Sequence, residues 1–205
     1  MNSADFLSKA FHHAQVSYPD IWERWIKVSL RLGSLLPDSL LTANVQREGS
    51  LDLLIRSLED DIVEYGKSGR NDDLLRYNNL VLTTGYWVGG VYEILRLLRA
   101  RKLTAGQDFE RLTKAFEIIR VPLDKHELAG ERTLKSPIPM VKIPAIGNEI
   151  DHYTYDPVDP KRSFIAPMEL TSTGSLKWLV MDVRDGHSGW IERREMSDQF
   201  LRLWD

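Results

Sequence analysis

Residues 71–102 read NDDLLRYNNLVLTTGYWVGGVYEILRLLRARK, the longest segment of the chain without a proline or another strong helix stop. Acidic Asp72 and Asp73 stand at its beginning, and basic side chains gather at its end. This is the charge order that the dipole of an α-helix favours. The segment therefore predicts one helix of about eight or nine turns.

The centre of this segment carries three glycines, and each costs about 1 kcal/mol relative to alanine inside a helix. Gly85 and Gly89 are four residues apart and share one helix face, where missing side chains let a second helix approach closely. We expect helix packing within a bundle at Gly85 and Gly89. A dimer seam or a nucleotide cleft at this face is the alternative.

The chain before this helix also has helical periodicity. We expect helices over residues 3–18, capped by Ser3, over 19–33, beginning at Pro19, and over 50–65, capped by Ser50. Residues 37–47 are expected to be irregular. The uncharged run 79–92 is shorter than the ~20 apolar residues of a membrane-spanning helix, so it predicts a buried helix and no membrane partner.

After the long helix, residues 107–119 predict a fifth helix. Pro122 lacks an N–H and restricts Val121, so we expect the helix to break there. A short helix over residues 123–129 is expected to follow, and Gly130 ends it.

Beyond residue 133 the pattern changes to short extended runs, separated by six of the nine prolines. Strands are expected over residues 140–143, 150–155, 163–170, 175–183 and 190–193, with a turn at 171–174 and a closing helix over 196–204. The prediction is an α+β fold. A helical bundle of residues 1–132, with a long central helix, precedes a subdomain of residues 133–205 that holds a small antiparallel β-sheet and a C-terminal helix.

The composition excludes several classes of protein. The 205 residues are 42% hydrophobic and 28% charged, with a net charge of −3, which is typical of folded soluble domains and gives no overall attraction to polyanions. No cysteine is present, which fits a reducing compartment, and we expect the cytoplasm. Phosphate-loop, serine-elbow and HExxH patterns are absent too. We expect neither a cofactor nor a bound metal.

Positive charge concentrates in residues 96–125, where eight basic side chains face four acidic ones. Such a strip can neutralise phosphates along a nucleic acid strand. The alternative is a solvated helix end that compensates the helix dipole. The predicted RNA-binding residues are Arg96, Arg99, Arg101, Lys102, Arg111, Lys114 and Lys125.

Arg120 and His126 lie in the same strip and have complementary chemistry. Arginine is a permanent cation that binds phosphate, and histidine exchanges a proton near neutral pH, so together they suit RNA cleavage by an attacking 2′-hydroxyl. On an unbroken helix six residues place them about 120° apart, at about 100° per residue. Only a bend at Pro122 brings them together.

An arginine followed after four to six residues by a histidine at the start of a helix is the motif of the HEPN superfamily. The chain resembles this superfamily over about residues 50–130, through a long helix, a turn and Arg120 to His126, although Val121 and Pro122 stand where the family commonly has a polar residue. The resemblance implies that Arg120 holds the scissile phosphate and that His126 is the general acid and base. The alternative is that Arg120 pairs with Glu117 or Asp124.

Two functions follow as hypotheses. The first is an RNA-directed, HEPN-like homodimer that acts as a metal-independent endoribonuclease in toxin–antitoxin or antiphage defence, or as an RNA-binding relative. The second is a non-enzymatic interaction module or adaptor that binds another protein through its C-terminal subdomain. Exposed aromatic side chains would favour the second, and Trp178, Trp190 and Trp204 are the candidates.

Overall fold

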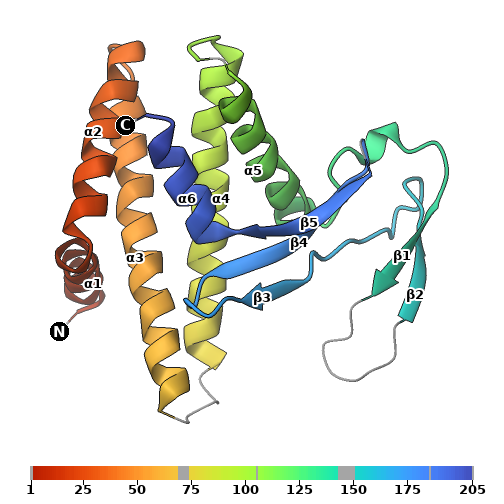
Figure 1. The fold of residues 1–205 in the computed structure, drawn as a ribbon, viewed down its shortest axis with the longest axis horizontal. Helices are drawn as coiled ribbons and strands as arrows, with labels where there is room; N and C mark the ends of the chain where they lie inside the picture. The colour runs from red at the N-terminus through yellow and green to blue at the C-terminus, as the bar shows by residue number, and fades with distance from the viewer. Residues whose placement is uncertain (1, 69–73, 105, 143–150, 185, 205) are drawn as a thin grey trace.

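The structure is a computed structural model that describes residues 2–68, 74–104, 106–142, 151–184 and 186–204. It has the predicted α+β class (Figure 1). In chain order the elements are α1 (Ser3–Ser17), α2 (Pro19–Leu35), α3 (Leu41–Lys67), α4 (Leu74–Ala100), α5 (Gln107–Lys125), the 3₁₀ turn η1 (Glu131–Thr133), β1 (Ile138–Lys142), β2 (Asp151–Tyr155), β3 (Met168–Leu170), β4 (Leu176–Asp182), β5 (His187–Glu192) and α6 (Arg193–Arg202).

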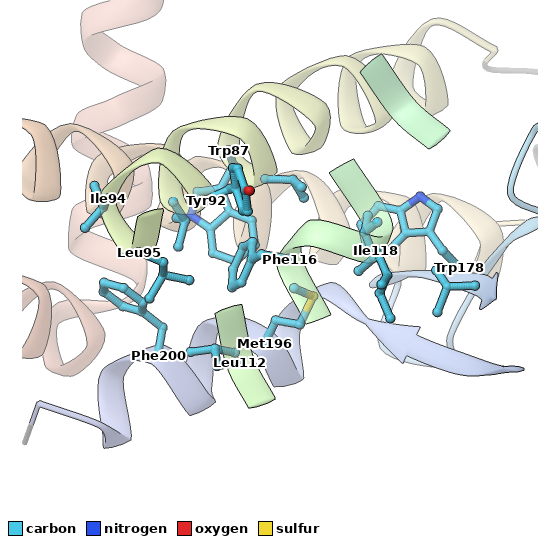
Figure 2. Close-up of a cluster of buried hydrophobic side chains, with 14 of the residues drawn as sticks. Trp87, Tyr92, Ile94, Leu95, Leu112, Phe116, Ile118, Trp178, Met196 and Phe200 are labelled. Carbon is cyan, nitrogen blue, oxygen red and sulfur yellow. The ribbon is translucent and has the colours of Figure 1, made fainter. Parts of the chain in front are cut away.

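The helices form one layer in which α3 and α4 are the long central pair, flanked by α2 on one side and α5 on the other (Figure 1). The C-terminal helix α6 returns to this layer and packs against both α2 and α5. Its Phe200 stacks on Trp25 of α2 at a ring distance of 5.2 Å. Trp87 of α4 meets Phe116 of α5 at 5.4 Å (Figure 2). The aromatic side chains thus join helices from both ends of the chain.

The hydrophobic core is continuous across the predicted boundary between residues 132 and 133. Buried side chains of the strands, among them Trp178, belong to the same cluster as Trp87 and Phe116 (Figure 2). Alternate residues of β4 are buried, as expected for a strand with one face on the core and the other toward solvent. The boundary marks the change from helices to strands, while the core is shared.

The long central helix is confirmed as α4, and its predicted beginning at residues 71–73 lies outside the described residues. The packing predicted at Gly85 and Gly89 is wrong among the described residues, because an added Cβ at either position meets none of their atoms within 4 Å apart from the backbone of α4 itself. Close approach occurs at Gly90 instead, where a Cβ would lie 2.3 Å from the carboxyl carbon of Glu48. The buried side chain of Glu48 occupies that space. The spacing of the glycines within α4 does not predict this contact with another helix.

Two predicted helix starts are wrong. Asn2 rather than Ser3 caps α1, since its side-chain oxygen accepts the Asp5 N–H at 2.9 Å. The third helix begins at Leu41, about nine residues before the predicted cap Ser50, which lies inside α3. Buried Leu41, Val45 and the residues that follow continue one helical stripe, and its burial outweighs the capping preference of a serine.

The predicted break at Pro122 is also wrong, because α5 runs through Pro122 to Lys125. His126 ends the helix in the left-handed conformation, with φ of 56°, and its N–H donates to the Pro122 carbonyl at 3.2 Å. No separate helix forms over residues 123–129. Pro122 is buried beside buried Ile118 and Ile119, and this burial compensates for the lost backbone hydrogen bond.

The strands form two antiparallel sheets rather than one. β1 pairs with β2, and the second sheet has the order β3-β4-β5. The turn at residues 171–174 is confirmed by the Gly174 N–H, which donates to the Thr171 carbonyl. β3 is shorter than predicted, β5 begins three residues earlier, and α6 begins at Arg193 instead of Met196. Residue 143 of the first predicted strand and residue 150 of the second lie outside the described residues.

Within the described ranges, the helices are either too short or too polar to span a lipid bilayer.

Candidate functional site

A cationic hollow of about 520 Å³ opens on the outer side of α5. We call it the arginine hollow. Its walls come from the last turn of α4, the first half of α5 and the chain after β4. The lining residues are Arg99, Gln107, Glu110, Arg111, Lys114, Glu117 and Arg184.

Three separate segments bring these cations together. Arg111 and Lys114 are three residues apart on α5 and so share one helix face. Because α4 and α5 run antiparallel (Figure 1), the last turn of α4 places Arg99 beside the beginning of α5. Arg184 lies two residues after the end of β4, and β4 belongs to the sheet that packs on α5. The result is four cations around one hollow that also holds Glu110 and Glu117.

Buried Asp182 holds one side of the hollow in place. The Arg184 side chain donates to both of its carboxylate oxygens, at 2.9 and 3.0 Å, and the Lys114 ammonium lies 3.0 Å away. Burial alone would raise the pKa of Asp182, but these hydrogen bonds outweigh burial and lower the pKa to about 2. Asp182 therefore stays ionised near neutral pH and fixes both cations.

Arg99 and Arg111 are held more loosely. The Arg99 guanidinium lies 3.9 Å from the Glu110 carboxylate, and the Arg111 guanidinium lies 3.4 Å from Asp108. Both pairs are substantially exposed, and exposed ion pairs contribute only about 0–1 kcal/mol. These two arginines can exchange their carboxylates for phosphate oxygens at little cost.

The remaining predicted RNA-binding residues lie outside this hollow. The Arg96 guanidinium binds Glu93 at 2.7 Å on α4. Arg101, Lys102 and Lys125 are exposed, and in the described ranges they have no carboxylate partner. The hollow brings together three of the seven predicted residues and adds Arg184, which was not predicted because it lies far along the chain.

Arg120 and His126 do not line the hollow. The Arg120 guanidinium donates to Asp124 at 2.9 Å and lies over the Tyr92 ring at 4.9 Å, which confirms the alternative in which it pairs with Asp124. His126 is exposed at the end of α5, where its carbonyl accepts the Phe164 N–H at 2.7 Å. Glu117, the other predicted partner of Arg120, binds Arg184 instead.

A second hollow, of about 360 Å³, lies between α5, β5 and α6. We call it the slot. It adjoins the arginine hollow, because Arg111 and Lys114 line both. Its apolar lining residues are Ala115, Ile118, Ile191 and Met196, and its other lining residues are Asp182, Trp190, Glu192, Glu195 and Gln199.

The three C-terminal tryptophans differ in exposure. Trp178 is buried in the core, against expectation, because it points from β4 toward α5. Trp204 is partly buried and meets Phe109 edge-on at 6.4 Å. Trp190 is 42% exposed, and the Lys177 ammonium lies 4.5 Å from its ring centre. Trp190 thus remains as an exposed aromatic side chain of the strands.

A buried network of charges that the sequence did not predict fastens α6 to α3. Arg193 is fully buried and donates to Glu59 at 2.8 Å through two nitrogens and to Asp52. Arg56 joins Asp52 at 3.0 Å and Asp198 at 2.6 Å. Asp52, Arg56 and Glu59 are three or four residues apart and therefore lie on one face of α3. That spacing is the sequence feature that indicates a cluster of charges on the inward face of the helix. No cavity adjoins these groups among the hollows described above, so we assign the network to stability.

In the described part of the chain, three or more acidic or histidine side chains nowhere gather as a metal site would require. Comparison with known proteins finds no matching family model, no matching curated protein and no matching solved structure.

Proposed function

We propose that the protein binds an RNA strand through the arginine hollow. The observation that carries the proposal is the convergence of Arg99, Arg111, Lys114 and Arg184 from three segments around one hollow. Guanidinium groups offer a fixed fork of donors that matches phosphate oxygens. Four cations and two carboxylates line the hollow, and Asp108 and Asp182 beside it pair with Arg111, Lys114 and Arg184. The proposal therefore depends on the exposed Arg99 and Arg111, which can exchange their carboxylates for phosphate oxygens.

The proposal concerns binding rather than cleavage. Arg120 already has Asp124 and Tyr92 as partners, and neither Arg120 nor His126 lines the hollow. The endoribonuclease activity and the relationship to the HEPN superfamily stay predictions. Incubation with total RNA in EDTA tests them directly. The binding proposal expects intact RNA, whereas cleavage that is lost in His126→Ala would place catalysis at that residue.

The binding itself is tested by fluorescence anisotropy with a labelled RNA strand at increasing salt. We expect the affinity to fall steeply between about 50 and 200 mM salt, since each phosphate contact releases counterions. Reversing two charges, in Arg99→Glu with Arg111→Glu, is expected to weaken binding at least ~10-fold and to flatten the salt dependence.

The matched control reverses two exposed lysines far from the hollow, in Lys9→Glu with Lys67→Glu. It changes the net charge equally, so it isolates the effect of position. Equal loss in both double variants, or RNA binding that is insensitive to salt, would contradict a site in the arginine hollow.

A second candidate function, self-association, rests on the outer face of α4. Leu75, Leu82 and Tyr86 are 73%, 57% and 70% exposed, and the space over Gly85 and Gly89 is open. Two antiparallel copies of α4, related by an axis between Gly85 and Tyr86, would place Leu82 opposite Gly89 and Tyr86 opposite Gly85 of the other copy. The face is therefore complementary to itself, as a two-fold dimer requires.

Light scattering after size-exclusion chromatography tests this dimer. We expect the unmodified chain to be a dimer and the variant Leu82→Glu with Tyr86→Glu to be a monomer, because four carboxylates would be buried in the seam. Leu30→Glu is the control, since Leu30 is 60% exposed on α2 and lies away from this face. An unmodified chain that stays monomeric at high concentration would exclude the dimer. A protein partner for the C-terminal residues stays a prediction.

A further inference from the structure

The slot beside the arginine hollow has the chemistry of a site for a flat, polar ring. On one side it is lined by Ala115 and Ile118 of α5, and on the other by Ile191 of β5 and Met196 of α6. A hollow of about 360 Å³ with apolar walls is near the lower end of the usual size range of small-molecule sites. Arg111 and Lys114 stand at its junction with the arginine hollow.

The open edge of β5 carries a main-chain hydrogen-bond donor and acceptor next to the residues that line the slot. β5 is an edge strand of the sheet β3-β4-β5. The Leu179 N–H donates toward β3, to the Pro167 carbonyl at 2.9 Å. Because successive peptide groups of a strand point to opposite edges, the two neighbours of Leu179 form their hydrogen bonds with β5. Trp178 pairs there with Ile191, and Val180 pairs with Gly189.

Trp190 lies between these two residues, so its N–H and C=O point away from the sheet. Trp190 lines the slot, and none of the backbone hydrogen bonds outside the helices and sheets involves these two groups in the described residues. Trp190, one of the residues that line the slot, thus carries a donor and an acceptor side by side on the open edge of β5. The edge of a nucleobase presents the complementary pair.

We propose that the slot holds one unstacked base of the RNA strand whose phosphates lie in the arginine hollow, an inference that rests on the proposed function. The base lies between the apolar side chains of α5 and those of β5 and α6, and its edge pairs with the Trp190 main chain. Glu195 lines the slot from α6 and is exposed. A carboxylate only accepts hydrogen bonds, so it favours bases with an exocyclic amino group over uracil.

Calorimetric titration with small phosphates tests the slot. We expect the unmodified protein to bind AMP at least ~10-fold more tightly than ribose 5-phosphate or inorganic phosphate. UMP is expected to bind more weakly than CMP, which carries an exocyclic amino group on a ring of the same size, and Glu195→Ala is expected to reduce that difference while leaving the binding of ribose 5-phosphate unchanged. Because Glu195 is exposed, this variant keeps the fold.

Filling the slot is the second arm of the test. Ala115→Leu is expected to reduce the affinity for AMP to that for ribose 5-phosphate, while the salt dependence of RNA binding is kept. Ala10→Leu on α1 is the control, because it adds the same side chain elsewhere. Equal affinities for AMP and ribose 5-phosphate in the unmodified protein would overturn the base site and leave the RNA proposal standing. RNA binding that ignores salt would overturn the RNA proposal itself.

Discussion

Replacing Arg193 by alanine is expected to lower the free energy of unfolding by about 3–5 kcal/mol, the typical cost of removing one partner from a buried ion pair. Arg193 has no exposed surface and pairs with two carboxylates, those of Asp52 and Glu59, which are themselves buried. Its loss leaves two negative charges facing each other, with Arg56 paired to Asp52 and Arg194 paired to Glu59. α6 should then detach from α3.

Thermal and urea denaturation measure this loss, and Arg202→Ala is the matched control. Arg202 lies on the same helix but is exposed, so its removal should change the stability by less than ~0.5 kcal/mol. Similar losses in both variants would mean that helix propensity, rather than the buried network, accounts for the effect.

The same network makes the stability depend on pH. Burial alone would raise the pKa of Asp52, but the charges of Arg56 and Arg193 outweigh burial and lower it. A carboxyl with a lowered pKa in the folded state stabilises the fold above its unfolded pKa of about 3.9 and loses this contribution as the pH falls further. Urea titrations of the unmodified chain should therefore show stability decreasing below about pH 4.

Gly174→Ala is expected to cost about 2–5 kcal/mol, because two penalties add at this position. Gly174 has φ of 76°, a conformation that costs an L-residue about 1–2 kcal/mol. An added Cβ would also lie 2.2 Å from the Glu59 carbonyl oxygen, which belongs to the backbone of α3 and cannot move aside. Such overpacking typically costs about 1–3 kcal/mol.

Gly186→Ala separates the two penalties. Gly186 has a similar φ of 67°, but an added Cβ meets nothing within 4 Å in the described ranges. This variant should lose only the conformational part, about 1–2 kcal/mol, in the same denaturation experiment. If Gly174→Ala is no worse than Gly186→Ala, the turn between β3 and β4 does not press against α3 in solution.

Much of the fold follows from local patterns. The α4 helix is predicted from residues 71–102 because the absence of proline and the order of charges act within one helix. The turn at residues 171–174 is predicted for a similar reason, since its hydrogen bonds close within four residues. The errors at Ser50 and Pro122 arise where burial against distant residues outweighs a local preference, and no pattern along the chain measures that burial.

The candidate site shows the same division. The basic character of residues 96–125 is visible in the sequence, because charge is a property of composition. Which of those cations remain available is a matter of distances between segments. Asp182 forms an ion pair with Lys114, and Asp124 forms one with Arg120. Glu110 lies 3.9 Å from Arg99.

The linear order of residues thus specifies the helices, the turns and the supply of charge, since each depends on neighbours within a few positions. The tertiary structure decides which side chains contact one another. It places Arg193 between Asp52 and Glu59 and adds Arg184 to the hollow on α5. It also leaves Gly85 uncovered among the described residues. Electrostatic and packing energies fall off over a few ångströms, and residues that lie that close in space are often more than a hundred positions apart in the chain.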